Sequence, residues 1–203
     1  MIYDQIEIAV NLLKQGKPIL FPTDTVYGLG ADATSTAAIR SIFQLKNRPT
    51  TQALPVLLPD IQHIYHWIDE DSLNSSGLKT KLFNLVENFW PGPLTIVVKK
   101  SSKVSNLLTA GKDSIAIRIP NHPVTLELLK NFNSGIIGSS ANKSGDASSK
   151  NFLQAQNAFD NKLFVLDGGE CNIGTESTIV SLIDTPIIIR HGAITANKLA
   201  NYL

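Results

Sequence analysis

The sequence is poor in several residues and patterns that mark specialised classes of protein. Cys171 is the only cysteine among 203 residues, so the chain can form neither an intramolecular disulfide framework nor a thiolate metal site. One cysteine fits a reducing compartment, and we expect a cytoplasmic location. No uninterrupted apolar run approaches the roughly 20 residues that cross a bilayer. The N-terminal MIYDQIEIAV has no basic flank before its apolar residues, so we expect neither a secretory signal nor a membrane partner.

Charge of either sign is not in excess, because 18 Lys+Arg face 17 Asp+Glu and leave a net charge of +1. This balance excludes a polycation that coats nucleic acid, so any basic function must come from a local patch. His63 and His66 lie three residues apart but have no suggestive carboxylates nearby, and we expect no protein-held metal. The phosphate-binding pattern GxxxxGK[ST] is also absent.

The apolar periodicity predicts one domain, residues 1–203, that mixes helices and strands. One-sided and two-sided apolar strands indicate an α/β fold with a twisted open mixed sheet and flanking helices. The glycine-rich segment 23–33 is expected to be a turn. Helices are predicted over 2–13, 36–46, 78–89, from about 123, and over about 195–203. Strands are predicted at 18–21, 53–58, 94–99, 114–119, 134–141, 163–167, 177–183 and 186–190.

Two cations stand at the end of the second predicted helix, in the order Lys46-Asn47-Arg48-Pro49. Arginine can bind a polyphosphate as a bidentate fork and lysine as a point charge. A solvated helix end, where the helix dipole favours cations, is the more common explanation for this pattern taken alone. We expect both side chains to be exposed to a cleft.

Three polar segments could contribute to the same site. Thr25 precedes two glycines after a buried strand, which lets a ligand approach closely, although a simple turn explains the pattern equally well. The segment 138–145, with Ser140 and Asn142, is either an anion cradle or a flexible loop. Ser177 and Arg190 would meet at one edge of the sheet if their strands pair as a hairpin.

The stretch 99–118 holds five cations and one acid, a net charge of +4. A solvated surface explains most of its lysines. Arg118 differs, because it ends the apolar strand SIAI and precedes Ile119-Pro120. A charge at such a strand end is a candidate partner for a carboxylate or a phosphate.

Each segment is weak alone, but their order along the chain is specific. From about Ile6 to Ile194 the sequence resembles the YrdC-like family of threonylcarbamoyl-AMP synthases. The resemblance rests on FPTDTVYGLGADA, LKNRP, WPGPLTIVV, IAIRIPNHP, SSANKSG, ESTIV and RHGAI.

The resemblance implies a nucleotidyltransferase that condenses L-threonine, bicarbonate or CO2, and ATP into threonylcarbamoyl-AMP, with release of pyrophosphate. It implies Mg2+ with ATP and no tightly bound organic cofactor. The product would serve the modification of tRNA adenosine 37 through a separate threonylcarbamoyl transferase complex. A tRNA or other double-stranded RNA is a candidate direct partner.

The resemblance also implies roles for individual residues. The catalytic residues would be Lys46, Arg48, Ser140 and Asn142. Threonine would be bound by Thr25, Arg118 and Ser177. ATP would be bound by Arg48, Gln52, Ser114, Ser140, Ser148 and Arg190.

The chain departs from the family pattern at two positions. Many members read RPxxNPLxVH where this chain reads RPTTQALPVLL, so Leu57 replaces a histidine and Gln52 an asparagine. Two alternatives therefore stay open. One is a related adenylating enzyme with another substrate, and the other is an RNA-binding module that uses the +4 stretch. The near-neutral total charge counts against the second.

Overall fold

The chain is described by a computed structural model that covers residues 2–74 and 77–203. Its strands form a four-stranded sheet in the order β7-β2-β1-β8 and a six-stranded sheet in the order β10-β9-β4-β5-β3-β6. The first sheet consists of β1 (Ile19–Phe21), β2 (Gly28–Gly30), β7 (Ser139–Ser140) and β8 (Phe164–Val165). The second consists of β3 (Val56–Leu57), β4 (Leu94–Lys99), β5 (Ser114–Arg118), β6 (Ile136–Ile137), β9 (Thr178–Ser181) and β10 (Ile187–Arg190).

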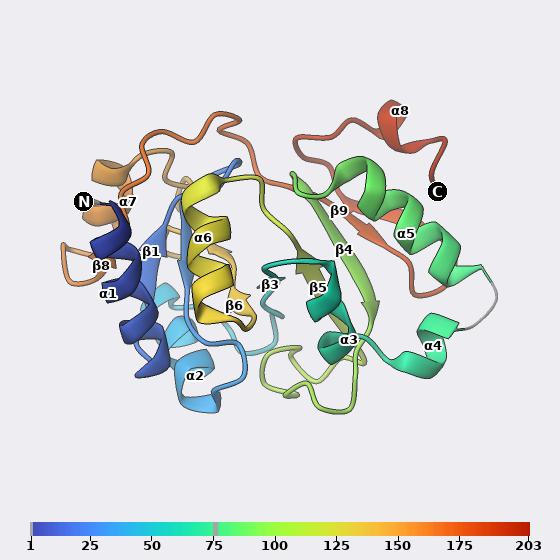
Figure 1. Cartoon of the computed structure of the whole chain (residues 1–203), viewed down its shortest axis with the longest axis horizontal. Coiled ribbons are helices and arrows are strands. Elements are labelled where there is room, and N and C mark those ends of the chain that lie inside the picture. The colour runs from blue at the N-terminus through green and yellow to red at the C-terminus, as the bar shows by residue number, and fades with distance from the viewer. Residues whose placement is uncertain (1, 75–76) are drawn as a thin grey trace.

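The two sheets lie side by side and helices pack around them (Figure 1). Both sheets mix parallel and antiparallel pairs, which confirms the predicted mixed α/β class with flanking helices. The prediction of one continuous sheet was wrong in detail. Only Gly138 separates β6 from β7, yet β6 pairs with β3 and β7 pairs with β2. The chain therefore passes from one sheet to the other at Gly138.

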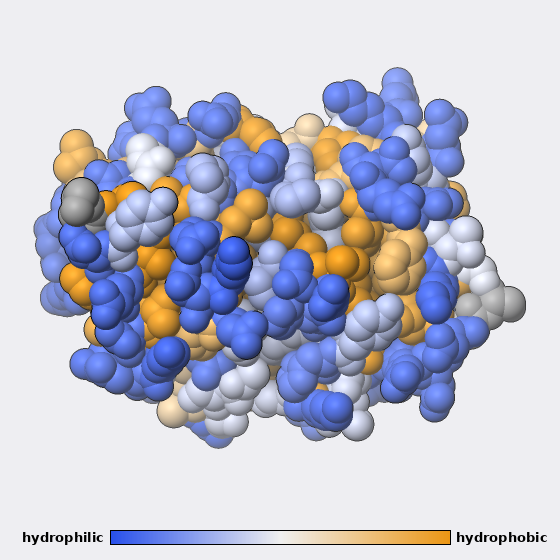
Figure 2. Space-filling model, in the orientation of Figure 1, coloured by the Kyte–Doolittle hydropathy of each residue, from blue (hydrophilic) through white to orange (hydrophobic). Residues whose placement is uncertain are grey.

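The longer helices begin and end close to the positions that the periodicity predicted. Helix α1 buries Ile6, Ala9, Val10 and Leu13 and packs on α6 and β1. No helix in the described ranges is long and apolar enough to cross a membrane. The face drawn in Figure 2 is mostly hydrophilic on the outward sides of these helices. The helices are α1 (Ile2–Lys14), α2 (Thr36–Lys46), the 3-10 helix η1 (Ile61–His63), α3 (Ile64–Trp67), α4 (Glu70–Asn74), α5 (Leu78–Phe89), α6 (Pro123–Phe132), α7 (Phe152–Ala158) and α8 (Ala196–Leu199).

The glycine-rich segment expected to be a turn contains an inner strand instead, β2, between β1 and β7. A Cβ atom on Gly28 would lie 2.8 Å from the Phe21 ring, and one on Gly30 would lie 2.1 Å from the carbonyl oxygen of Ile137. The two glycines therefore allow neighbouring groups to approach more closely than any side chain would. This close packing brings Thr25, which precedes β2, beside the six-stranded sheet.

The end of α2 directs the two cations of the sequence motif to different places. Ser35 caps the start of the helix by accepting a hydrogen bond from the Ala38 amide. Asn47 adopts a left-handed conformation with φ of 49°, and the Arg48 amide bonds back to the Phe43 carbonyl. Lys46 continues the buried face of the helix, whereas Arg48 lies beyond the turn.

Candidate active site

A cavity of about 350 Å³ opens between the two sheets. Its walls come from the segment between β1 and β2, from β7, and from β4, β5, β9 and β10. The residues of the sequence-based site that line it are Thr25, Arg48, Arg118, Ser140, Ser177 and Arg190. Segments up to 165 residues apart in the chain therefore meet here, as the ordered motifs predicted.

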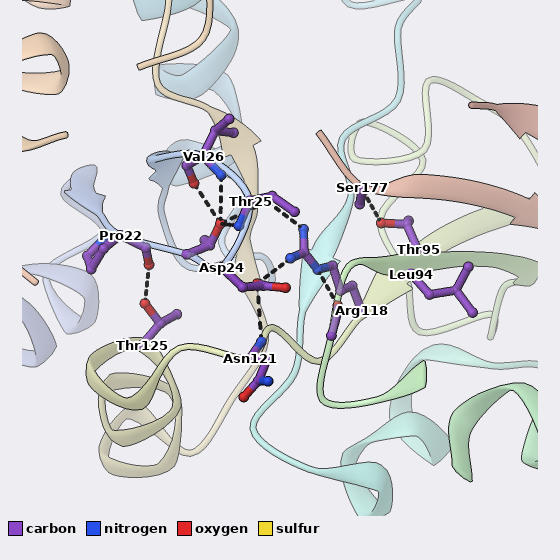
Figure 3. Close-up of polar contacts among 12 residues, drawn as sticks. Pro22, Asp24, Thr25, Val26, Leu94, Thr95, Arg118, Asn121, Thr125 and Ser177 are labelled. Atoms are coloured by element: carbon purple, nitrogen blue, oxygen red, sulfur yellow. Dashed lines mark hydrogen bonds and ion pairs between the residues drawn. The ribbon is translucent and has the colours of Figure 1, made fainter. Parts of the chain in front are cut away.

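Arg118 lies at the cavity wall with only 6% of its surface exposed. Its Nε donates to the Gly92 carbonyl at 2.8 Å, its Nη1 to Thr25 Oγ1 at 3.0 Å, and its Nη2 to Asp24 Oδ1 (Figure 3). A guanidinium carries five N–H groups. Three are thus donated to described residues, and one N–H on each Nη atom has no hydrogen-bond partner among them.

Asp24 belongs to the candidate site through its contact with Arg118, and no role was assigned to it from the sequence. Its Oδ1 also accepts from the Asn121 amide at 3.1 Å, whereas its Oδ2 is buried and has no hydrogen-bond partner among the described residues. Burial lowers the pKa of Arg118, and the neighbouring Asp24 charge opposes this shift. A buried arginine needs a counter-ion, and that requirement is the signal that could have identified Asp24.

Lys46 joins the predicted segment 140–142, but from inside the protein. Its Nζ donates to the carbonyl oxygens of Ser140 at 2.5 Å and Asn142 at 2.7 Å, and to Asn142 Oδ1 at 3.2 Å. Only 2% of the residue is exposed, so the expectation that it faces the cleft was wrong. The cause is helical periodicity, since Lys46 follows Ile39, Ile42 and Phe43 on the buried face of α2.

The segment around Ser140 and Asn142 is fixed rather than flexible. Ser140 Oγ donates to Asn142 Oδ1 at 2.6 Å, and Asn142 Nδ2 donates to the Asp146 carbonyl at 2.7 Å. The Ser144 amide closes the loop onto the carbonyl of Lys46 at 3.0 Å. These bonds present the Ser140 side of the loop to the cavity, while Asn142 lies behind it.

Burial gives Lys46 a measurable pH signature. Desolvation, with a smaller contribution from the Arg48 charge, lowers the pKa of Lys46 to about 8, and Glu176 opposes the shift. Between pH 8 and about 10.5 the unfolded chain therefore binds more protons at this lysine than the folded protein does. Stability due to this group rises with pH through that window and is lost as pH falls through the folded pKa.

We expect the free energy of unfolding of the parent protein, taken relative to that of Lys46→Met, to depend on pH. It should rise by up to about 2 kcal/mol when the pH is raised from 7.5 to 9.5. Urea denaturation of both proteins at the two pH values measures it. Other titrating groups cancel in the difference. A constant difference would show that Lys46 keeps an ordinary pKa.

Arg48 lines the cavity, and its guanidinium is held by backbone carbonyls four and five residues further along the chain. Its Nε donates to the Gln52 carbonyl at 3.2 Å and its Nη2 to the Ala53 carbonyl at 3.0 Å. Burial lowers the pKa of Arg48, and Glu176 opposes this effect. Gln52 thus contacts the site through its backbone, whereas its side chain is exposed and outside the cavity lining.

The condition under which Ser177 and Arg190 would meet is fulfilled, because β9 and β10 are antiparallel neighbours. Arg190 Nη2 donates to the carbonyl oxygen of Ser177 at 2.9 Å and to its Oγ at 3.1 Å. Ser177 Oγ also shares a hydrogen bond of 2.8 Å with Thr95 Oγ1, the pair drawn in Figure 3. The sequence reasoning missed Thr95, although it lies in the predicted strand 94–99.

Glu176 is the second missed acid in the site. Its Oε2 accepts from Arg190 Nη1 at 2.6 Å, and its Oε1 accepts from Ser148 Oγ at 3.0 Å. Ser148 itself is outside the cavity lining. Ser114 is also outside the lining, at the far end of β5 on the same face as Arg118, about 13 Å away by strand geometry.

Arg118 does not belong to the exposed part of the +4 stretch. Arg118 is buried and paired, Lys99 lies 3.3 Å from Asp69, and Lys100 donates to the Val104 carbonyl and to Asn106.

The described residues contain no group of three or more His, Cys, Asp or Glu that could hold a metal ion. Fold and site together define an α/β protein with a cation-rich cavity between two sheets.

Comparison with known proteins places this architecture in a family. Residues 11–192 match the model of the Sua5/YciO/YrdC family, which carries the description "Telomere recombination". A relative from Vibrio parahaemolyticus called threonylcarbamoyl-AMP synthase is 31% identical over 93% of this chain and 100% of its own length. The chain belongs to the Sua5/YciO/YrdC family.

Other relatives are longer. The threonylcarbamoyl-AMP synthase of Bacillus subtilis is 37% identical, and the match covers 96% of this chain but 55% of that protein. The crystal structure of Pyrococcus abyssi Sua5 complexed with L-threonine is 34% identical with a TM-score of 0.91, over 98% of this chain and 57% of that one. The chain therefore spans little more than half the length of these relatives.

Proposed function

We propose that this chain is a threonylcarbamoyl-AMP synthase, a nucleotidyltransferase that forms threonylcarbamoyl-AMP and pyrophosphate from L-threonine, bicarbonate or CO2, and ATP. The observation that carries the proposal is the position of Arg118, which lines one cavity together with Arg48 and Ser140. The names of the curated relatives support the same activity.

Threonine binds at the Arg118 side of the cavity. Its carboxylate accepts one hydrogen bond from each Nη atom, a bidentate geometry that arginine is suited to provide. Thr25 and Ser177 offer hydroxyl groups beside this position, because both line the cavity. Leu57, Ala116 and Ile179 supply apolar surface for the methyl group of the substrate. The Pyrococcus abyssi relative, whose structure is a complex with L-threonine, supports threonine as the substrate.

ATP binds on the side formed by Arg48, Ser140 and Arg190, with Ser148, Gln52 and Ser114 as further contacts. Lys46 and Asn142 act from behind by fixing the Ser140 loop. Mg2+ enters with the nucleotide as part of the substrate and offsets the charge of its phosphates. Ser140 and Arg118 belong to different sheets, so the two substrates are presented from different walls.

The reaction proceeds by positioning and charge stabilisation. The deprotonated amine of threonine captures CO2 and forms a carbamate. A carbamate oxygen then attacks the α-phosphorus of ATP, and pyrophosphate leaves as the new P–O bond forms. The Arg48 guanidinium stabilises the negative charge on the phosphates. No covalent intermediate with the protein is required.

The product serves a separate transferase complex that modifies adenosine 37 of tRNA. We infer a cytoplasmic setting for this step, which the single buried thiol of Cys171 supports. Direct tRNA binding by this chain is the secondary element of the proposal, because the stretch 99–118 has exposed lysines but its Arg118 is buried and paired with Asp24.

The decisive experiment is an assay of pyrophosphate release by the purified protein with ATP, Mg2+, bicarbonate and one amino acid. We expect release that requires both threonine and bicarbonate, and that is about tenfold or more slower with serine, which lacks the methyl group. Equal release with serine, or without an amino acid, would indicate another adenylating activity. No turnover together with salt-sensitive RNA binding would indicate an RNA-binding module.

A further inference from the structure

The carboxylate of Glu176 lies among the cations on the proposed ATP side of the cavity, and the proposed reaction assigns it no role. Glu176 is the one acid among the described residues that line the cavity. It contacts Arg190 Nη1 at 2.6 Å and Ser148 Oγ at 3.0 Å. Both partners are groups that the proposed function gives to ATP. The carboxylate thus makes the contacts that a phosphate oxygen would make.

The position of Glu176 lets it connect the two sides of the cavity. Glu176 directly precedes Ser177 and β9 of the six-stranded sheet, whereas Ser148 follows β7 of the four-stranded sheet. The side chain of Glu176 is 39% exposed and that of Arg190 is 41% exposed. A ligand can therefore reach this pair, and the glutamate can turn outward into solvent.

The electrostatic effect of Glu176 extends beyond its direct contacts. Its charge raises the pKa of both Lys46 and Arg48, against the lowering caused by burial. The carboxylate is thus a counter-ion shared by the cations around the Ser140 loop. A triphosphate bound to the same cations has the same sign as Glu176, and two anions this close repel each other.

Arg190 does not depend on Glu176 for its position. Its Nε and Nη2 donate to the carbonyl oxygen of Ser177, and Nη2 also donates to Ser177 Oγ. Loss of the carboxylate contact would free Nη1 of Arg190 and Ser148 Oγ while the guanidinium stays attached to β9. The partners needed by a phosphate therefore become available by movement of one side chain.

We propose that Glu176 is a displaceable latch, whose carboxylate occupies the phosphate position between Arg190 and Ser148 until a nucleotide replaces it. The proposal rests on the proposed ATP site. The latch offsets the charge of the nearby cations, joins the two walls of the cavity, and competes with the triphosphate, so it weakens nucleotide binding.

The test compares Glu176→Gln with the parent protein. Glutamine keeps the size and one of the two acceptor oxygens but removes the charge, so the electrostatic competition with the triphosphate is lost. We expect ATP and inorganic triphosphate to bind about three- to tenfold more tightly to Glu176→Gln by isothermal titration calorimetry. Glu87→Gln, which removes the same charge from the exposed side of α5, is expected to match the parent.

Unchanged or weaker binding by Glu176→Gln would overturn the latch, and weaker binding only with Mg2+ would show instead that the carboxylate helps to hold the nucleotide's metal. Glu176→Ala repeats the test without the hydrogen bonds, and the same direction is expected. Threonine-dependent pyrophosphate release by the parent protein is scored separately. A parent that binds ATP without this release would refute the function and leave the latch to be judged by binding alone.

Discussion

Arg118→Lys is expected to lower kcat/KM for threonine about 100-fold, because a lysine keeps the charge but cannot donate two parallel hydrogen bonds to a carboxylate. Most of the loss should be in KM for threonine, whereas the dissociation constant of ATP should change by less than about twofold. Pyrophosphate release at varied threonine and calorimetry with ATP measure the two quantities. The remaining positive charge still pairs with Asp24, which limits the loss of stability.

Arg40→Lys provides the matched control, because Arg40 is exposed on α2. It should change neither threonine KM nor ATP binding. A threonine KM that is unaltered in Arg118→Lys would mean that Arg118 is only the structural partner of Asp24. Equal weakening of threonine and ATP would mean that the substitution disturbs the whole cavity.

Lys46→Met is expected to lower the rate of pyrophosphate release at least about 100-fold and to lower stability at the same time. The substitution leaves the carbonyl oxygens of Ser140 and Asn142 without their buried donor. The loss of these hydrogen bonds lowers the free energy of unfolding, and the removal of a buried charge offsets part of that decrease. The net decrease should be about 2 kcal/mol. For a chain of this size the melting temperature should fall by about 4–8 °C.

Lys162→Met is the control, since that side chain is 77% exposed at the surface. It should alter stability by less than about 0.5 kcal/mol and leave turnover unchanged. If Lys46→Met abolishes turnover without any fall in melting temperature, Lys46 acts on the substrate directly. If it affects neither quantity, the Ser140 loop does not need its buried anchor.

The longer helices were predictable because their apolar residues repeat locally, whereas the short helices η1, α3, α4 and α7 were not predicted. Ile6, Ala9, Val10 and Leu13 identify α1 without knowledge of any other element. The same rule applied to α2 would have placed Lys46 on the buried face with Ile39 and Ile42, so its burial was available from the sequence. Its charge led instead to the expectation of an exposed residue.

Other features depend on contacts between distant segments. β2 could not be recognised from Gly28 and Gly30, because glycine is usually depleted in strands and its place here depends on Phe21 and Ile137. The partners of the site cations were hidden for the same reason, since Asp24 and Arg118 are 94 residues apart. The order of the motifs identified six residues of the cavity lining, but not the acids that pair with its arginines. The six are Thr25, Arg48, Arg118, Ser140, Ser177 and Arg190.

The left-handed residue between the two cations has a consequence for sequence design. Asn47, at φ of 49°, ends α2 and allows Lys46 to point inward while Arg48 faces the cavity. Glycine, asparagine and aspartate adopt this conformation at low cost, whereas β-branched residues do not. Designed variants of the motif should therefore vary position 47 only among such residues. Adding one residue within α2 would turn Lys46 by about 100° around the helix and separate its ammonium group from the loop that it anchors.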